Sequence, residues 1–407
     1  MNMLTLFNSL GKKIEQFRPA GRDGVNIFTC GPSVYQRVHI GNFRTFLFED
    51  ILVRYLEYSG YRVQRGMTIT DIEDKAIEEA ARRKTDLHRL ADENIRRFVE
   101  EMKLLRMKVP DFLPRASGCV EEAVDLTESL MKLKAAYRYG NNVYFDPLKF
   151  PGFGRLYGLD MSRWPSKKRR FHKDTYPGMR WNLGDFILWH GYREGDRYYW
   201  DTKIGRGRPA WNIQDPAMIS RYFDESLSVY CGGIDNLVRH HDYTCAVLES
   251  VRPYPVAKFW LHCRHLHVEG KKMSKSKGNI YYTDTLLKDG YSADEIRFFL
   301  IYGHYRRNLN FSDATMDAAV GRLRKFRDSL GKIRARGKAA APVSCLISRQ
   351  LRSAFSEKMD DDLNVKAAFD ALQEVLHDVK VKDLMPGEAL HVTETLREID
   401  SVLQVIF

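Results

Sequence analysis

The feature that most constrains this chain is a strand, a turn and a helix close to its amino terminus. Residues 25–30 read Val-Asn-Ile-Phe-Thr-Cys, an apolar run typical of a buried strand. Gly31-Pro32-Ser33 interrupts the run, and residues 41–58 carry apolar side chains at helical spacing. A second strand is expected over residues 61–70. This order predicts an α/β unit whose loop lies at the carboxyl end of the first strand, where open sheets bind nucleotides.

Composition excludes several classes of protein. Hydrophobic residues make up 44% of the 407 residues, enough to bury a core, so a chain disordered throughout is excluded. No apolar run approaches the roughly 18 residues that a membrane span requires, and the amino terminus lacks the order of a signal peptide. The six cysteines include no CxxC pair, so we expect no disulfide scaffold and mostly buried thiols. These features indicate a cytoplasmic protein, which we expect to be monomeric.

The positive charge is concentrated in two runs. The formal net charge is +12, and basic side chains gather at residues 163–173 and 322–338. Either run could be a solvated face of the protein. Two runs in one basic chain also fit the surface of a polyanion-binding protein, and nucleic acid is the commonest such partner.

The pattern of apolar residues and of glycine and proline divides the chain into four parts. Residues 1–108 and 206–288 are predicted to form the two halves of a nucleotide-binding domain, separated by an inserted subdomain at 109–205. Residues 289–407 are helical in pattern, and Ser292 opens this region with a capping box. The predicted fold class is therefore α/β, with a Rossmann-type domain, an inserted subdomain and a carboxyl-terminal helical bundle.

Three short motifs carry the chemistry. His39-Ile40-Gly41-Asn42 lies where the first helix begins, so that a phosphate could meet backbone N–H groups, an imidazole and an amide. Lys272-Met273-Ser274-Lys275-Ser276 lies between glycines, and its two lysines could hold a pyrophosphate on a closing loop. Gly233-Ile234-Asp235 offers a carboxylate to a ribose hydroxyl, with space beside it for a base. The first and third motifs are weak signals alone, whereas the second is specific.

The order and spacing of these motifs resemble those of class I aminoacyl-tRNA synthetases, and most closely those of the cysteinyl-tRNA synthetase family. The resemblance covers the chain from Leu4 to Phe407. It rests on seven segments: Cys30-Gly-Pro-Ser-Val-Tyr35, His39-Ile-Gly-Asn42, Ile69-Thr-Asp-Ile-Glu-Asp-Lys75, Gly232-Gly-Ile-Asp235, His240-His241, Gly303-His-Tyr-Arg306 and Met359-Asp-Asp-Asp362.

The resemblance implies that the chain uses ATP with Mg²⁺ to make an aminoacyl adenylate. It then implies transfer of the aminoacyl group to a tRNA 3′ end. The implied catalytic residues are His39, Asn42, Lys272 and Lys275, which would stabilise charge on the phosphates. The implied ATP site adds Gly41, Gly233, Asp235 and Ser274. The implied amino-acid pocket consists of Cys30, Thr70, Trp211, Asp215, His240 and Thr244.

The chain departs from this family at the zinc ion that selects the substrate thiol. The family holds zinc with two cysteines, a histidine and a glutamate, and the matching residues here are Cys30, Asp215, His240 and Thr244. Zinc bound by Cys30, Asp215 and His240 would keep an open position for a substrate thiolate. Alternatively the site lacks a metal, and Asp215 bonds to a different side chain. Cys231 is a substitute ligand or an ordinary buried cysteine. We expect zinc to be held weakly or not at all, because one of two thiolates is lost.

A second departure concerns the carboxyl terminus. Members of the family usually continue past the helix that matches residues 396–407 into a small anticodon-reading domain, which this sequence does not include. Three hypotheses therefore stay open. The chain charges a tRNA, or it joins the activated amino acid to a small-molecule amine, or it is a catalytically silent RNA-binding paralogue. The intact nucleotide motifs favour adenylate chemistry over the third hypothesis.

Overall fold

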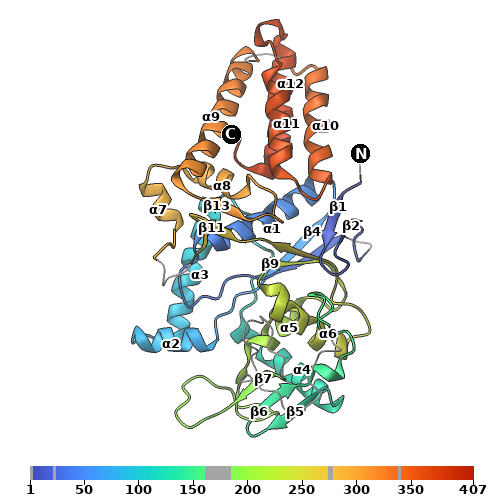
Figure 1. Cartoon of the computed structure of the whole chain (residues 1–407), viewed down its shortest axis with the longest axis vertical. Helices are drawn as coiled ribbons and strands as arrows, with labels where there is room; N and C mark the ends of the chain where they lie inside the picture. Colours follow the sequence, from blue (N-terminus) through green and yellow to red (C-terminus); the bar gives the residue numbers. More distant parts are fainter. Residues whose placement is uncertain (1–2, 22–23, 161–184, 274–277, 338–340) are drawn as a thin grey trace.

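A four-stranded parallel sheet forms the centre of the computed structural model (Figure 1). Its order is β10-β9-β3-β4. Since β4 follows β3 on one side and β9 joins β3 on the other, the winding of the chain reverses between β3 and β9, which is where open sheets bind ligands. The strands are β3 (Val25–Thr29), β4 (Val63–Met67), β9 (Leu227–Gly233) and β10 (Ala257–Cys263). The structure describes residues 3–21, 24–160, 185–273, 278–337 and 341–407.

Helix α1 (Ile40–Tyr58) connects β3 to β4 and confirms the helix predicted over residues 41–58. It is buried along most of its length, because the sheet covers one side and the carboxyl-terminal helices cover the other. The predicted strand over residues 61–70 is shorter than expected. After Met67 the chain turns along the loop that follows β3, where Thr68 N donates to Thr29 O and Thr70 N donates to Pro32 O.

Gly31 makes this close approach possible. A Cβ atom at Gly31 would lie 1.8 Å from the carbonyl oxygen of Thr68, so no other residue fits without moving the backbone. The loop after β3 and the segment after β4 therefore run side by side at the edge of the sheet where the nucleotide motif begins.

The inserted subdomain lies at one end of the molecule, at the bottom of Figure 1. Helices α2 (Asp74–Arg82) and α3 (Leu87–Leu104) precede it. It contains α4 (Val120–Lys132) and an antiparallel sheet in the order β5-β6-β7-β8. The strands of this sheet are β5 (Ala136–Tyr139), β6 (Asn142–Phe145), β7 (Phe186–Gly191) and β8 (Gly207–Pro209).

The chain then returns to the central sheet. Helix α5 (Trp211–Tyr222) leads into β9, and a π-helical turn (Leu237–His241) joins β9 to α6 (Asp242–Val251). A small sheet in the order β12-β11-β13 follows. The remaining short strands are β1 (Thr5–Asn8), β2 (Lys13–Gln16), β11 (Leu266–Val268), β12 (Lys271–Lys272) and β13 (Leu309–Phe311).

Long helices form the opposite end of the molecule, at the top of Figure 1. The predicted capping box at Ser292 is confirmed, because its hydroxyl accepts from Glu295 N while the Glu295 carboxylate accepts from Ser292 N. The apolar stripe Leu323, Phe326, Leu330 and Ile333 is buried, as its spacing predicts. The helices are α7 (Thr283–Lys288), α8 (Ala293–Ile301), α9 (Asp313–Arg336), α10 (Leu346–Asp360), α11 (Val365–His377) and α12 (Pro386–Leu403).

A buried ion pair holds this bundle against the central domain. Asp50 of α1 lies 2.7 Å from Arg297 of α8, and both side chains are fully buried. Arg297 also donates to the carbonyl oxygens of Leu105 and Leu403. The bundle is therefore held by charge-assisted hydrogen bonds that reach α1, the helix that carries the nucleotide motif.

The predicted α/β fold with an insertion and a helical bundle is confirmed, whereas the four domain boundaries stay a prediction. All six cysteines are buried and unpaired. Within the described residues, no helix has both the length and the apolar character needed to cross a bilayer.

Candidate active site

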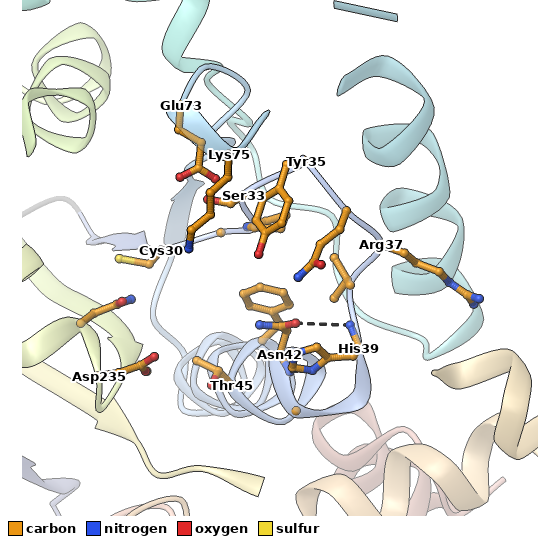
Figure 2. Close-up of a pocket in the computed structure, with 18 of the residues that line it drawn as sticks. Cys30, Ser33, Tyr35, Arg37, His39, Asn42, Thr45, Glu73, Lys75 and Asp235 are labelled. Carbon is orange, nitrogen blue, oxygen red and sulfur yellow. Dashed lines mark hydrogen bonds between the residues drawn. The ribbon is translucent and has the colours of Figure 1, made fainter. Parts of the chain in front are cut away.

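A cavity of 610 Å³ opens at the carboxyl ends of β3 and β9, at the reversal of the sheet (Figure 2). Eight of the predicted site residues line it: Cys30, His39, Gly41, Asn42, Trp211, Gly233, Asp235 and Lys272. Thr70, Asp215, His240 and Thr244 are buried and do not line it. Ser274 and Lys275 lie outside the described residues. The fold thus gathers predicted residues from four distant segments around one space.

His39 and Asn42 cap the amino terminus of α1 in a reciprocal arrangement. Asn42 N donates to His39 Nδ1 at 3.3 Å, and His39 N donates to Asn42 Oδ1 at 3.3 Å, the bond drawn in Figure 2. Because Nδ1 accepts a hydrogen bond, a neutral His39 carries its proton on Nε2 and is a donor there. A Cβ atom at Gly41 would lie only 3.0 Å from the His39 ring, so a larger residue at this position would crowd the imidazole.

Asp235 and Lys272 lie on other walls of the same cavity. In Figure 2, Asp235 and His39 lie on either side of Thr45 of α1. A Cβ atom at Gly233 would lie 2.7 Å from Asp235 Oδ1, so Gly233 allows the carboxylate to fold back beside the end of β9. Lys272 lies at the end of β12, is the first residue of the motif Lys272–Ser276, and is exposed.

The side of the cavity next to the insertion is polar, and the sequence predicted no role for its residues. Glu73 and Lys75 come from the start of α2, and Arg208 of β8 pairs with Asp74. Burial raises the pKa of Glu73, although a hydrogen bond from Ser33 acts in the opposite direction. The ion pair between β8 and α2 connects the inserted subdomain to the mouth of the cavity.

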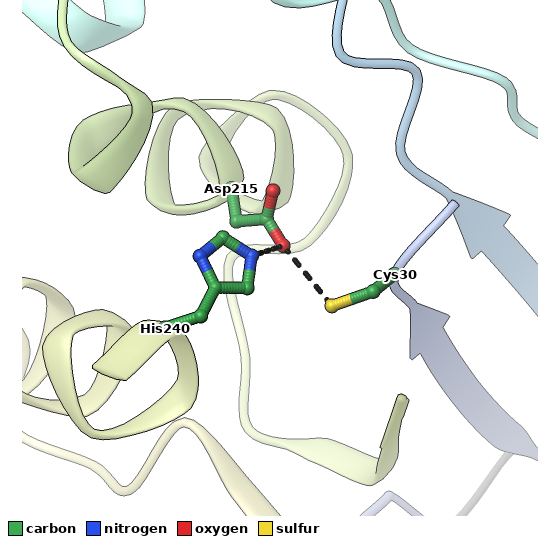
Figure 3. Close-up of side chains that lie close together, drawn as sticks. All are labelled: Cys30, Asp215 and His240. Carbon is green, nitrogen blue, oxygen red and sulfur yellow. Dashed lines mark hydrogen bonds and ion pairs between the residues drawn. The ribbon is translucent and has the colours of Figure 1, made fainter. Parts of the chain in front are cut away.

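Cys30 of the cavity wall forms a compact cluster with Asp215 and His240, which do not line the cavity (Figure 3). Cys30 Sγ donates to Asp215 Oδ2 at 3.5 Å, and His240 Nε2 lies 2.8 Å from the same oxygen. The His240 ring stacks on Trp211 with ring centroids 4.2 Å apart. Burial, together with the Asp215 carboxylate, raises the pKa of the Cys30 thiol well above its ordinary value, so the thiol stays protonated.

These donor types can bind zinc, and their ligand atoms all lie within 4.8 Å of one another. A zinc ion shared by an imidazole nitrogen and a carboxylate oxygen in tetrahedral geometry holds them about 3.3 to 3.5 Å apart. His240 Nε2 and Asp215 Oδ2 lie 2.8 Å apart, the length of a direct hydrogen bond. Thr244 adds no ligand, because its hydroxyl donates to the carbonyl oxygen of His240. Cys231 is a fully buried residue outside the cluster.

Four further side chains complete the cluster, and sequence reasoning gave none of them a role. Tyr230 Oη donates to Asp215 Oδ2 at 2.6 Å, and His241 Nε2 lies 3.0 Å from Cys30 Sγ. His241 Nδ1 lies 2.8 Å from His262 Nε2, and Ser9 Oγ lies 2.7 Å from His262 Nδ1. These residues come from β9, β10, the π-helical turn and the β1–β2 turn, so only the pairing of strands brings them together.

The structure describes the second basic run up to Gly337, but not the first. Residues 163–173 lie within 161–184, outside the described residues. In the second run, Arg322, Arg324 and Arg327 form ion pairs with acidic side chains of the bundle. Three of the eight basic residues of this run are therefore paired within the fold. Lys325 and Lys332 are exposed, and no ion pair is found for either among the described residues.

Comparison with known proteins finds tRNA synthetases. A family model described as the tRNA synthetases class I (C) catalytic domain matches residues 16–321. The chain is 34% identical to the cysteine–tRNA ligase of Chlamydia pneumoniae, over 99% of this chain and 86% of that protein. It is also 34% identical to the cysteine–tRNA ligase of Solibacter usitatus, over 99% of this chain and 87% of that protein.

Solved structures show the same fold at lower identity. Methionyl-tRNA synthetase of Mycobacterium tuberculosis, in complex with methionyl-adenylate, has a TM-score of 0.66 at 16% identity, over 95% of this chain and 90% of that chain. LeuRS of Agrobacterium radiobacter, in a ternary complex with tRNA and LeuAMS, has a TM-score of 0.68 at 13% identity, over 96% of this chain and 85% of that chain.

The cavity is lined by residues of all three motifs and lies where a capped helix meets the reversal of a parallel sheet. These features define a class I synthetase-type ligase. With the family match over three quarters of its length, the chain belongs to the class I aminoacyl-tRNA synthetase family. Within that family it falls in the cysteinyl-tRNA synthetase group. Binding of ATP with Mg²⁺ follows from the family.

Proposed function

We propose that this ligase activates cysteine or another small, uncharged amino acid and transfers it to the 3′ end of a tRNA. The observation that carries the proposal is the cavity of 610 Å³, whose walls include His39, Asn42, Lys272 and Asp235 and which also reaches Cys30. A nucleotide and an amino acid therefore fit side by side, as a reaction between them requires.

In the activation step, the carboxylate of the amino acid attacks the α-phosphorus of ATP, and pyrophosphate leaves. Negative charge develops on the phosphate oxygens, and the amino terminus of α1 faces them with its N–H groups. His39 Nε2, Asn42 and Lys272 add donors, and Lys275 of the same motif as Lys272 supplies a second ammonium group. Asp235 accepts from the ribose hydroxyls, which fixes the α-phosphorus relative to the amino acid. Preorganised donors of this kind act mainly on the transition state.

The preference for an uncharged side chain follows from the groups around Cys30. Cys30 presents a protonated thiol, and Trp211 presents an indole ring. The carboxylate of Asp215 lies behind the wall and already accepts from His240 and Tyr230. Between Cys30 and Trp211, a charged substrate side chain would lose its water without gaining a partner from these two groups, which is unfavourable.

Two assays test the proposal. Amino-acid-dependent exchange of pyrophosphate into ATP, measured with each of the twenty amino acids, should respond to cysteine or another small uncharged one. Exchange with lysine or glutamate would refute the assignment of the pocket, and no exchange with any amino acid would refute activation. Charging of total tRNA is then measured with the activated amino acid. Activation without any charging, and with turnover restored by a small amine, would identify a small-molecule ligase instead.

A further inference from the structure

Arg37 lies two residues before His39, and its charged end is used within the fold. Its guanidinium pairs with two carboxylates: Nη2 lies 2.5 Å from Glu101 Oε1 of α3, and Nη1 lies 2.7 Å from Asp284 Oδ2 of α7. The same group lies over the ring of Tyr282, 4.9 Å from the ring centroid. In Figure 2 the Arg37 side chain points away from the other labelled residues of the cavity. Arg37 therefore connects the chain just before α1 with two other helices.

The two carboxylates that Arg37 contacts have different surroundings. The Glu101 side chain is 8% exposed, whereas the Asp284 side chain is 46% exposed. The hydrogen bond from Arg37 holds the pKa of Asp284 below its ordinary value, so Asp284 is charged at neutral pH. A planar guanidinium can serve two carboxylates through different nitrogens. The buried Glu101 thus fixes Arg37 to α3, and Arg37 holds the start of α7 from that fixed point.

Residues 278–283, which we call the return segment, connect the motif Lys272–Ser276 to α7. The backbone N–H of Ile40, the first residue of α1, donates to Tyr281 O at 3.1 Å. Asn279 Nδ2 donates to Lys272 O at 3.4 Å. The return segment therefore contacts the first residue of α1 and the first residue of the lysine motif. Its position sets the separation between the start of α1 and Lys272.

We propose that Arg37 is a positioning residue for activation, because its pairing with Asp284 holds the return segment, and through it Lys272, in place relative to His39. The inference rests on the activation step of the proposed function, in which His39 and Lys272 act on the same phosphates. Donors of this kind work only if they are held where charge develops in the transition state. A misplacement of about 1 Å can reduce the rate by roughly 100-fold.

Asp284→Ala is the variant that tests the proposal, because it removes the link to α7 and leaves Arg37 paired with the buried Glu101. The bond from Ile40 to Tyr281 remains, so the return segment is loosened and not released. Single-turnover adenylate formation at saturating ATP should slow by roughly 10-fold. The ATP concentration for half-maximal rate should stay unchanged, since the link acts in the transition state. The amino acid used is the one that wild-type protein activates fastest.

Asp294→Ala is the matched control. Asp294 is the second residue of α8, as Asp284 is of α7, and it pairs with Arg106 and Arg327, which do not line the cavity. It should keep the wild-type rate of adenylate formation. Equal rates in the two aspartate variants would overturn the proposal, and so would a loss in Asp284→Ala that higher ATP restores.

A second comparison asks whether the link acts through the lysine motif. In a Lys272→Ala background, Asp284→Ala should slow adenylate formation by a smaller factor than in wild type, because the group that it positions is already lost. Equal factors in the two backgrounds would contradict the proposed route. If Asp284→Ala does not fold, Asp284→Asn removes the charge with a side chain of the same shape, and the same comparisons apply.

Deuterium uptake tests the anchoring without any substrate. In Asp284→Ala the amides of Ile40 and of residues 278–283 should take up deuterium faster than in wild type, whereas Asp294→Ala should match wild type there. Equal uptake in all three proteins would overturn the anchoring by Arg37. Because this measurement needs no reaction, a wild-type protein that forms no adenylate would count against the proposed function and not against the anchoring.

Discussion

His39 and Asn42 each bond to the backbone N–H of the other, at 3.3 Å in both directions. The pair closes the first turn of α1 and also fixes which nitrogen of His39 carries the proton. Two functions thus depend on one local contact, since the same residues stabilise the helix and present donors to the cavity. This relationship allows the two functions to be measured separately.

His39→Ala should reduce pyrophosphate exchange by roughly 100-fold or more, because one preorganised donor is lost from the transition state. It should also lower the free energy of unfolding by about 0.5 to 2 kcal/mol, through loss of the helix cap. Ser312→Ala is the matched control, since Ser312 caps α9 in the same type of box and does not line the cavity. It should lose similar stability and keep its exchange rate. An equal loss of activity in both variants would contradict a direct role for His39.

Lys272→Ala and Lys275→Ala should each slow adenylate formation by roughly 100-fold, because each removes a positive charge that would stabilise the leaving pyrophosphate. Lys271→Ala provides the comparison for Lys272, as both residues lie on β12 and are exposed, but Lys271 does not line the cavity. Single-turnover formation of the adenylate is the measurement. The assignment of Lys272 fails if the two β12 variants react at the same rate.

Asp50→Asn should lower the free energy of unfolding by about 3 to 5 kcal/mol, because it leaves Arg297 charged and unpaired in the interior. Burial acts to raise the pKa of Asp50, but the arginines Arg297 and Arg54 outweigh it, so the pKa lies below its ordinary value. A carboxylate with a lowered pKa stabilises the fold above its unfolded pKa, near 3.9, and this contribution fades as the pH falls. Urea titration should therefore show a shallower loss of stability in acid for Asp50→Asn than for wild type. If the free energy of unfolding fell equally steeply in acid for both proteins, the pairing would be contradicted.

Replacement of Lys325 and Lys332 with alanine should weaken tRNA binding and reduce its dependence on salt. For each phosphate that these lysines no longer neutralise, the slope of log K against log salt should become shallower by about 0.7 to 0.9. The measurement is binding at several salt concentrations, with amino-acid-dependent pyrophosphate exchange as the control that should stay constant. Arg324→Ala should instead reduce stability, since Arg324 pairs with Glu295 at 2.7 Å. An unchanged salt slope in the lysine variant would remove α9 from the RNA surface.

Local features were predictable from the sequence wherever neighbouring residues alone determine them. The helix after His39 follows from apolar spacing and from a polar cap, and the observed range Ile40–Tyr58 agrees with it. The capping box at Ser292 and the buried stripe of α9 follow in the same way. The departure from the family's zinc ligands at Asp215 and Thr244 stays a prediction from the residue types. The predicted strand over residues 61–70 was too long, because contacts with the loop after β3 end it at Met67.

The sequence by itself therefore determined the strand–helix unit, the nucleotide motifs and the family, since each depends on residues close together in the chain. The tertiary structure alone decided what surrounds Asp215. Tyr230, Cys30 and His240 reach it from three segments, and Ser9 and His262 lie 253 residues apart along the chain. Alternation along a strand predicts which face a side chain takes, but the pairing of β9 with β3 and β10 decides which side chains meet. The sequence also could not show which arginines of α9 form ion pairs, because their acidic partners come from other helices of the bundle.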